Sequence, residues 1–167
     1  MSMIGEYARL TPAELDRAVQ DPDWGWEFVE EQLAAGQDDG TPVRGSRLHS
    51  TGKMWHALEY LLRLRGVEVN VVHGEEEIPG AEEWGYGPPR TISPERVEVA
   101  VRAMAAITPE GLIEGVALAE LAEAGIYPYA DAEPGERLDD VAVAYQDLAA
   151  FFRTAARLRH GLLVWIA

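Results

Sequence analysis

The stretch that decides the fold is KMWHALEYLLRL, residues 53–64. A helix turns by about 100° per residue, so a helix over this stretch divides its side chains between two faces. The apolar face consists of Met54, Trp55, Ala57, Leu58, Leu61, Leu62 and Leu64. The polar face consists of Lys53, His56, Glu59, Tyr60 and Arg63. The pattern predicts a helix that packs its apolar face, with Trp55 in it, into a core.

The polar face is the first candidate site for a ligand. Lys53 and Arg63 are cations that can hold an anion, and His56 can carry a proton because an unperturbed imidazole has a pKa of about 6.5. Tyr60 adds a hydroxyl group to the same face. The alternative is an ordinary solvent-facing surface, stabilised by pairs at i,i+4 spacing such as Glu59–Arg63. If His56 is exposed, its truncation to alanine costs no more than about 0.5 kcal/mol.

The segment Gly85-Tyr86-Gly87-Pro88-Pro89-Arg90 is the second candidate site. Its glycines let a ligand approach the backbone beside Tyr86, and Arg90 can bind a carboxylate or phosphate through two parallel hydrogen bonds. The segment lacks the lysine and Ser/Thr of a phosphate loop. The alternative is a rigid turn that leads into a strand, with Arg90 paired to an acidic side chain. If the chain has a ligand site, we expect this segment and the helix at 53–64 to form it jointly.

The histidines and the missing cysteines argue against a metal centre. The histidines are His49, His56, His73 and His160. No two of them stand at the spacing of ligands on one helix turn, and the chain has no cysteine to supply a thiolate. A nucleophile elbow of the form GxSxG is also missing from the sequence. We therefore predict no metal and no cofactor.

Three stretches favour β-strands. Residues 3–10 form the first, in which Gly5 marks a bulge or a close approach of another chain segment. Residues 67–73 are rich in β-branched side chains, which favours a second strand. Residues 162–166 are wholly apolar, which predicts a central strand covered on both faces. We expect the first and last strands to pair or to lie close together.

The starts and ends of the helices are marked by capping residues. Thr11 and Glu14 form a capping box around Pro12. The other expected N-caps, each followed by proline, are Asp21, Ser93 and Thr108. Apolar residues at intervals of three and four predict that the longest helix runs from 138 to about 159, with Gly161 as its stop.

The order of these elements predicts the fold class. Strands stand near both ends and in the middle of the chain, with helices between them and no internal repeat. Residues 37–45 and 75–87 are rich in glycine, proline and acidic residues, which is typical of loops. We predict a single α+β domain over residues 1–167, with a small mixed sheet packed against several helices.

The formal net charge of −15 excludes several classes of partner. Binding to nucleic acid or to an anionic membrane surface needs a basic face. No stretch approaches the roughly 20 apolar residues of a membrane span, and the first residues lack the pattern of a signal peptide. The absence of cysteine suits a reducing compartment. We expect a cytoplasmic protein whose partner is a small molecule or another protein.

Six short segments, spread over nearly the whole chain, form a pattern that none of them makes alone. They are Met3-Ile4-Gly5, Lys53-x-Trp55-His56-x-Leu58-x-x-Leu61-Leu62, Val69-Asn70-Val71-Val72-His73-Gly74, Gly85-Tyr86-Gly87-Pro88-Pro89-Arg90, Ala124-Gly125-Ile126-Tyr127-Pro128 and Leu162-Leu163-Val164-Trp165-Ile166. In order and spacing, this pattern resembles the YfbM-like family, a bacterial domain of unknown function. The resemblance implies an α+β fold and a bacterial, cytosolic setting. It implies no activity, cofactor or catalytic residue.

Three functional hypotheses follow from the sequence. The leading one is a binding module for a small ligand or a protein. Its candidate residues are Lys53, His56, Tyr60, Arg63, Tyr86 and Arg90. The alternative is a small enzyme that uses Lys53, His56 and Arg90 for acid–base or anion-binding chemistry. A second alternative is a structural subunit of an assembly, which predicts a large exposed apolar patch.

Overall fold

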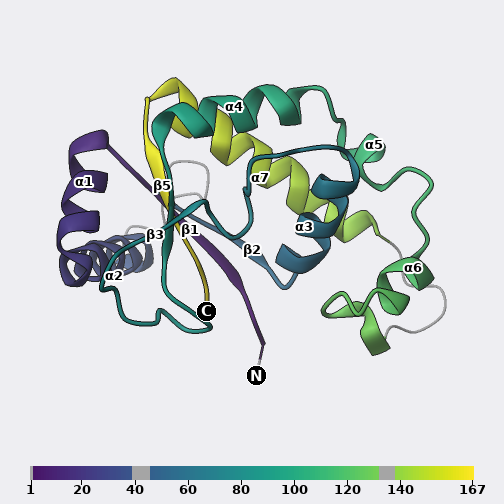
Figure 1. Cartoon of the computed structure of the whole chain (residues 1–167), viewed down its shortest axis with the longest axis horizontal. Helices are drawn as coiled ribbons and strands as arrows, with labels where there is room; N and C mark the ends of the chain where they lie inside the picture. Colours follow the sequence, from purple (N-terminus) through teal and green to yellow (C-terminus); the bar gives the residue numbers. More distant parts are fainter. Residues whose placement is uncertain (1, 39–45, 132–137) are drawn as a thin grey trace.

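A computed structural model describes residues 2–38, 46–131 and 138–167, which form a five-stranded sheet with helices on both faces (Figure 1). The strands are β1 (Gly5–Leu10), β2 (Leu48–Gly52), β3 (Glu76–Glu77), β4 (Arg90–Ile92) and β5 (Gly161–Ile166). The helices are α1 (Pro12–Gln20), α2 (Pro22–Asp38), α3 (Trp55–Leu64), α4 (Pro94–Ala105), α5 (Pro109–Ile113), α6 (Leu118–Glu123) and α7 (Asp139–Arg157), with a short 3₁₀ helix η2 (Tyr129–Asp131). The predicted α+β class is confirmed.

The first and last strands pair along their whole length, as predicted. The strand order is β2-β1-β5-β4-β3, and the pairing of β1 with β5 runs from Gly5 opposite Ile166 to Leu10 opposite Gly161. Every pair of neighbouring strands that the structure describes is antiparallel. The expectation of a mixed sheet was therefore wrong. A sequence pattern indicates where a strand lies, whereas its direction relative to a neighbour depends on the path of the connections.

As predicted, strand β5 is buried along its whole length. It is buried because helices cover both faces of the sheet. Leu162, Val164 and Ile166 belong to one core, which is completed by α3, α4 and α7. Leu163 and Trp165 belong to a second core, beneath α1 and α2. In Figure 1, α1 and α2 lie to the left of the sheet and the other helices to its right. The alternation of β5 side chains between two cores explains its wholly apolar sequence.

The predicted caps fix the helix starts. The Glu14 N–H donates to Thr11 Oγ1 at 3.2 Å, and the Thr11 N–H donates to the Glu14 carboxylate at 2.8 Å, which completes the capping box. At the other end of the chain, α7 does not stop at Gly161. The chain reverses at Arg159, whose φ of 58° is left-handed. Gly161 starts β5 instead, where a Cβ atom would collide with the Leu15 side chain.

Residues 67–73 are not a strand, so this prediction was wrong. The segment consists of turns, in which the Val71 N–H donates to the Val69 carbonyl and the Gly74 N–H to the Asn70 carbonyl. The Tyr7 hydroxyl, not a neighbouring strand, donates to the Val71 carbonyl at 2.8 Å. The valines of this segment are buried in the core. Their β-branched side chains therefore reflect burial, not strand pairing.

Strand β2 was not predicted, because residues 48–52 carry no apolar run or clear alternation. Their pairing with β1 makes them a strand. The register of this pair shifts between Gly5 and Glu6, which confirms the bulge expected there. Gly5 also allows a close approach, because a Cβ atom would collide with Thr51 and lie 2.9 Å from the Trp55 Cβ atom. A larger residue at position 5 would push β2 and the start of α3 away from β1.

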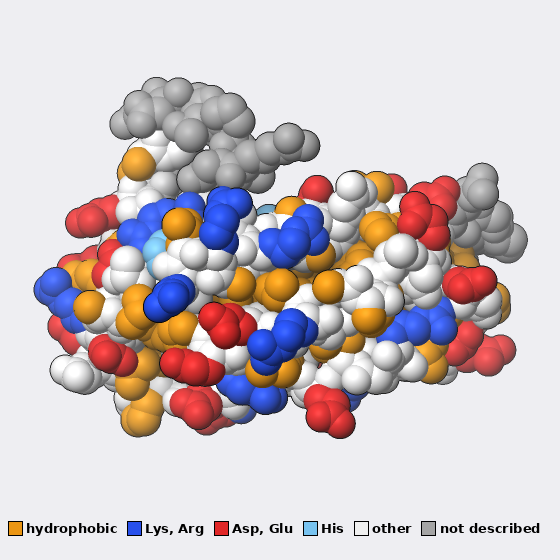
Figure 2. Space-filling model, turned by 90° about the horizontal axis from the view of Figure 1, so that it is seen from above, with side chains coloured by type: hydrophobic (Ala, Val, Ile, Leu, Met, Phe, Trp, Pro, Cys, Tyr) orange, Lys and Arg blue, Asp and Glu red, His pale blue; other side chains and the backbone are white. Residues whose placement is uncertain are grey.

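The surface seen from above α4 carries charges of both signs. Figure 2 shows red acidic side chains and blue basic side chains interspersed over this face, with orange hydrophobic ones between them. The surplus of carboxylates therefore does not make this face uniformly acidic. In the part of the chain that the structure describes, no helix is both long and apolar enough to cross a membrane.

Candidate functional site

Helix α3 turns its apolar face into the core almost as predicted. Its buried residues are Trp55, Ala57, Leu58, Leu61 and Leu62. Leu64 was expected on the same face, but it is 50% exposed. At about 100° per residue, Leu64 lies only about 40° from Tyr60, at the edge of the apolar side. Lys53 and Met54 precede the helix, and Lys53 is exposed.

Glu59 is the centre of the polar face. Its carboxylate oxygen Oε1 lies 2.9 Å from an Arg63 nitrogen and 3.2 Å from Nδ1 of His73. The hydrogen bond from His73 and the positive charge of Arg63 lower the pKa of Glu59, although its partial burial acts in the opposite direction. The carboxylate is therefore held ionised between two potential cations.

The turn after α3 brings His73 to Glu59. The His73 N–H donates to the Asn70 side-chain oxygen at 3.1 Å. The chain then bends at Gly74, whose φ of 81° is left-handed. A Cβ atom on Gly74 would lie 2.8 Å from the Cβ atom of Arg90, so only glycine fits this turn without a shift. The sequence analysis did not include His73 among the candidate site residues, because no local pattern places it beside Glu59.

His56 is partly buried and has a defined tautomer. Its Nδ1 atom accepts a hydrogen bond from the Tyr127 backbone N–H at 2.9 Å. The neutral ring therefore carries its proton on Nε2. The ring also stacks on Trp55, with centroids 4.8 Å apart and planes 10° apart. Burial lowers the pKa of His56, which favours this neutral form.

Tyr60 links α3 to α6. Its hydroxyl donates to a Glu120 carboxylate oxygen at 2.8 Å, and this hydrogen bond raises the pKa of the phenol. Tyr60 therefore helps to position α6 beside the polar face. Tyr60 also lines one of the two cavities described next.

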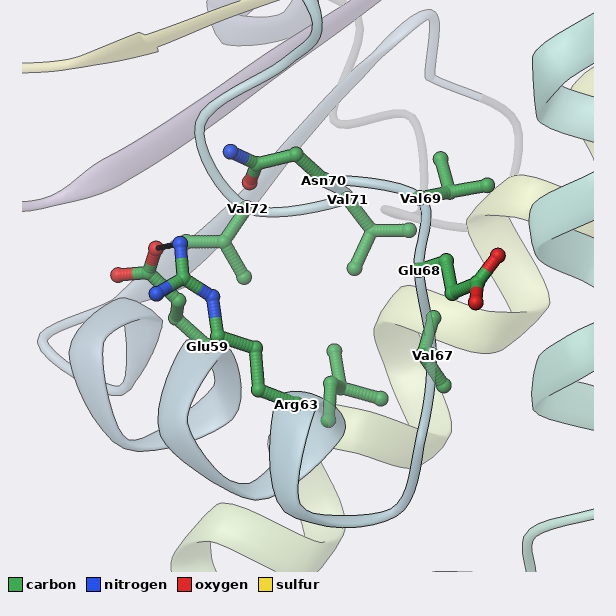
Figure 3. A pocket seen from close by; sticks show the side chains of 9 residues that line it. Glu59, Arg63, Val67, Glu68, Val69, Asn70, Val71 and Val72 are labelled. Atoms are coloured by element: carbon green, nitrogen blue, oxygen red, sulfur yellow. Dashed lines mark hydrogen bonds and ion pairs between the residues drawn. The ribbon is translucent and has the colours of Figure 1, made fainter.

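Two cavities flank the Glu59–Arg63 pair. One has a volume of about 330 Å³ and lies between α3 and residues 67–72. Figure 3 shows Val71 and Val72 pointing from that segment toward the helix, with Glu59 and Arg63 at one side of the space. The other has a volume of about 370 Å³, and His56, Tyr60 and Arg63 are among its lining residues. Glu59 and Arg63 line both cavities.

The other three candidate residues lie outside these cavities. Lys53 is exposed ahead of α3. Tyr86 is half exposed, and its backbone N–H donates to the Ile166 carbonyl at 2.8 Å. Arg90 lies on β4, 3.6 Å from the Glu77 carboxylate. Lys53, Tyr86 and Arg90 do not line either of the two cavities beside α3. The two cavities beside α3 therefore bring together His56, Tyr60 and Arg63 but not Lys53, Tyr86 or Arg90.

Within residues 2–38, 46–131 and 138–167, no three His, Cys, Asp or Glu side chains are grouped so that they could hold a metal ion. His56 and His73 both contact the Trp55 ring, His56 by stacking and His73 edge-on. The chemistry that the site offers is hydrogen bonding and charge pairing by side chains.

The family model described as "Domain of unknown function (DUF1877)" matches residues 1–165. Among solved structures, the protein of unknown function YfbM from Escherichia coli is similar, with a TM-score of 0.67 and 16% identity over 98% of this chain and 99% of that chain. At this identity the likeness shows the fold alone. No curated protein matches the chain. The resemblance to the YfbM-like family predicted from six short segments is confirmed.

Proposed function

Because the chain belongs to the DUF1877 family, for which no function is known, we propose a function from the geometry of α3: the protein is a binding module for a small ligand that carries a carboxylate group. The observation that carries this proposal is the position of Arg63 and Glu59 between two cavities. Volumes of about 330 and 370 Å³ fall at the lower end of the range typical of small-molecule sites.

Arg63 is the group that would hold the ligand. Its side chain is 70% exposed, whereas that of Glu59 is only 16% exposed. Within the described residues, its one hydrogen bond goes to Glu59 and leaves further guanidinium N–H donors open. Arginine binds carboxylates through two parallel hydrogen bonds, which gives both affinity and orientation. A carboxylate on the ligand therefore fits the open side of the Arg63 guanidinium.

Glu59, Val71 and Val72 contribute the other contacts through which the cavity would recognise the ligand. The ionised Glu59 carboxylate orients Arg63 and is itself held by His73. Val71 and Val72 form the apolar floor of the cavity beside α3, where only 2% and 1% of their surfaces are exposed to a ligand. Burial of apolar surface contributes about 25 cal/mol per Å², so an aliphatic part on the ligand would add to the affinity.

A panel of small carboxylates tests the proposal, with their amides as matched neutral probes. Binding to the folded state stabilises it by about 2.7 kcal/mol when the ligand is present at about 100 times its dissociation constant. We expect at least one carboxylate with an aliphatic part to raise the thermal unfolding midpoint, and its amide to have a much smaller effect. NMR chemical shifts of Arg63 and Val71 should change in the same titration.

Arg63→Gln removes the guanidinium group, and Arg96→Gln is the matched control. Arg96 forms the same kind of exposed ion pair, at 2.7 Å from Glu75, but it lines neither α3 cavity. We expect Arg63→Gln to abolish the carboxylate-dependent stabilisation and Arg96→Gln to retain it. The proposal is wrong if no carboxylate in the panel stabilises the protein, or if both variants respond alike.

A further inference from the structure

We propose that a groove between α1 and α4 binds an extended, basic peptide segment of a partner protein. This surface is separate from the α3 cavities, and none of its lining residues belongs to them. Its volume of about 690 Å³ is about twice that of either α3 cavity.

The groove arises where the two helix layers meet beyond a short edge strand. Helix α1 covers one face of the sheet and α4 the other, and β3, at the edge, has only two residues. Figure 1 shows α1 and the first turn of α4 at the same side of the molecule, near β3. A two-residue strand is too short to fill the space between these helices, so a concave surface remains open there.

The groove is lined in part by apolar side chains. Leu15 and Val19 contribute from α1, and Pro94 contributes from the start of α4. Leu15 is buried and belongs to the core beneath α1. Val19 and Pro94 are partly exposed, so they offer contact area to an aliphatic side chain without any rearrangement of the core. An occupant therefore needs an apolar component.

The same groove carries an excess of carboxylates from three elements. They are Asp16 on α1, Glu76 on β3, and Glu95 and Glu98 on α4. All four are exposed, and within the described residues none forms an ion pair with an Arg, Lys or His side chain. Arg159 is the one cation among the described residues that line the groove.

The three consecutive glutamates at 75–77 show the difference between paired carboxylates and those that line the groove. Glu75 pairs with Arg96, and Glu77 pairs with Arg90. Glu76, between them, lines the groove instead. Carboxylates gathered around a concave surface raise the local negative potential, which attracts a cationic partner and orients it on approach.

An extended peptide with alternating basic and apolar residues satisfies both features. In an extended chain successive side chains point to opposite sides, and lysine or arginine stems can lie along apolar surface while their charges reach the carboxylates. A free polyamine would match the carboxylates but would make little use of Leu15, Val19 and Pro94. The combination of charge and apolar contact therefore favours a peptide segment.

Fluorescence anisotropy with a labelled peptide of sequence Lys-Val-Lys-Val-Lys-Val tests the proposal on the full chain. The groove variant is the double substitution Glu95→Gln and Glu98→Gln. The control is Glu30→Gln with Glu31→Gln, which removes the same charge from exposed positions on α2. We expect the groove variant to weaken binding at least about tenfold, and the control to change it less than about twofold.

A third variant separates the peptide from a polyamine. Val19→Asn removes an apolar contact but no charge, so it should weaken binding of the peptide several-fold and leave binding of spermine unchanged. Circular dichroism would verify that each variant is folded. The proposal is overturned if the wild-type chain does not bind the peptide, if groove and control variants weaken binding equally, or if Val19→Asn affects peptide and spermine alike.

Discussion

His56→Ala tests whether the polar side of α3 is an exposed surface or part of the packed structure. The sequence pattern alone predicts a cost of no more than about 0.5 kcal/mol for an exposed residue. The structure predicts more. The substitution leaves the partly buried Tyr127 N–H without its acceptor, which costs about 1–2 kcal/mol. Loss of the ring stacked on Trp55 adds about 0.5–1 kcal/mol. We expect a total of about 2 kcal/mol.

Urea unfolding of the two proteins measures this difference through the midpoint, provided that the slope is unchanged. Lys53→Ala is the control, because Lys53 is exposed just ahead of the same helix and should cost less than about 0.5 kcal/mol. A His56→Ala cost as small as that of the control would refute the structural role assigned to the Tyr127 hydrogen bond.

The pH dependence gives a second, independent test of His56. Burial lowers the pKa of His56 in the folded state below its usual value, so the unfolded chain binds the proton more readily. Stability from this group is therefore fully present above the unfolded pKa of about 6.5 and decreases as the pH falls through the folded pKa. The difference in unfolding free energy between wild type and His56→Ala should be larger at pH 7.5 than at pH 5. A difference that does not change with pH would contradict the reasoning.

Two further predictions concern stability. Trp55→Ala removes a side chain that is 8% exposed and that donates a hydrogen bond to the Met3 carbonyl at 3.1 Å. The substitution should therefore lower the free energy of unfolding in urea by about 3–5 kcal/mol. A loss below about 1.5 kcal/mol would place Trp55 outside the core. Glu14→Gln weakens the pairing with Arg47, which is the main reason why the pKa of Glu14 is lowered to about 2. The wild type should therefore have the larger free energy of unfolding at pH 6, and this difference should disappear as the pH falls from about 4.5 to about 2. A difference that persists at pH 2 would argue against the stabilising role of the Glu14–Arg47 pair.

Some features of the fold were determined by the sequence itself because they depend on neighbours in the chain. The capping box at Thr11 joins residues three positions apart, so its side chains meet whatever the rest of the molecule does. The apolar face of α3 follows from the helical repeat. The wholly apolar sequence of β5 permits burial on both faces, and the structure places it in the middle of the sheet.

Other features of the fold depended on tertiary contacts. The valines at 67–73 have the composition of a strand, but the Tyr7 hydroxyl binds the Val71 carbonyl and the segment folds into turns. Strand β2 has no strand-like composition and exists because β1 offers it a partner. The antiparallel direction of the sheet follows from how the connections run, which no local pattern encodes.

The candidate site also has features that follow from local sequence and features that depend on tertiary contacts. The sequence itself determined that His56, Glu59, Tyr60 and Arg63 share one side of a helix, because their spacing fixes their directions around its axis. It could not determine what lies opposite them. His73 reaches Glu59 through a turn at Gly74, and the acceptor role of His56 comes from a backbone N–H that is 71 residues away in the chain. A periodic pattern gives the direction of a side chain, whereas its partner, burial and protonation are set by distant segments that only the folded chain brings together.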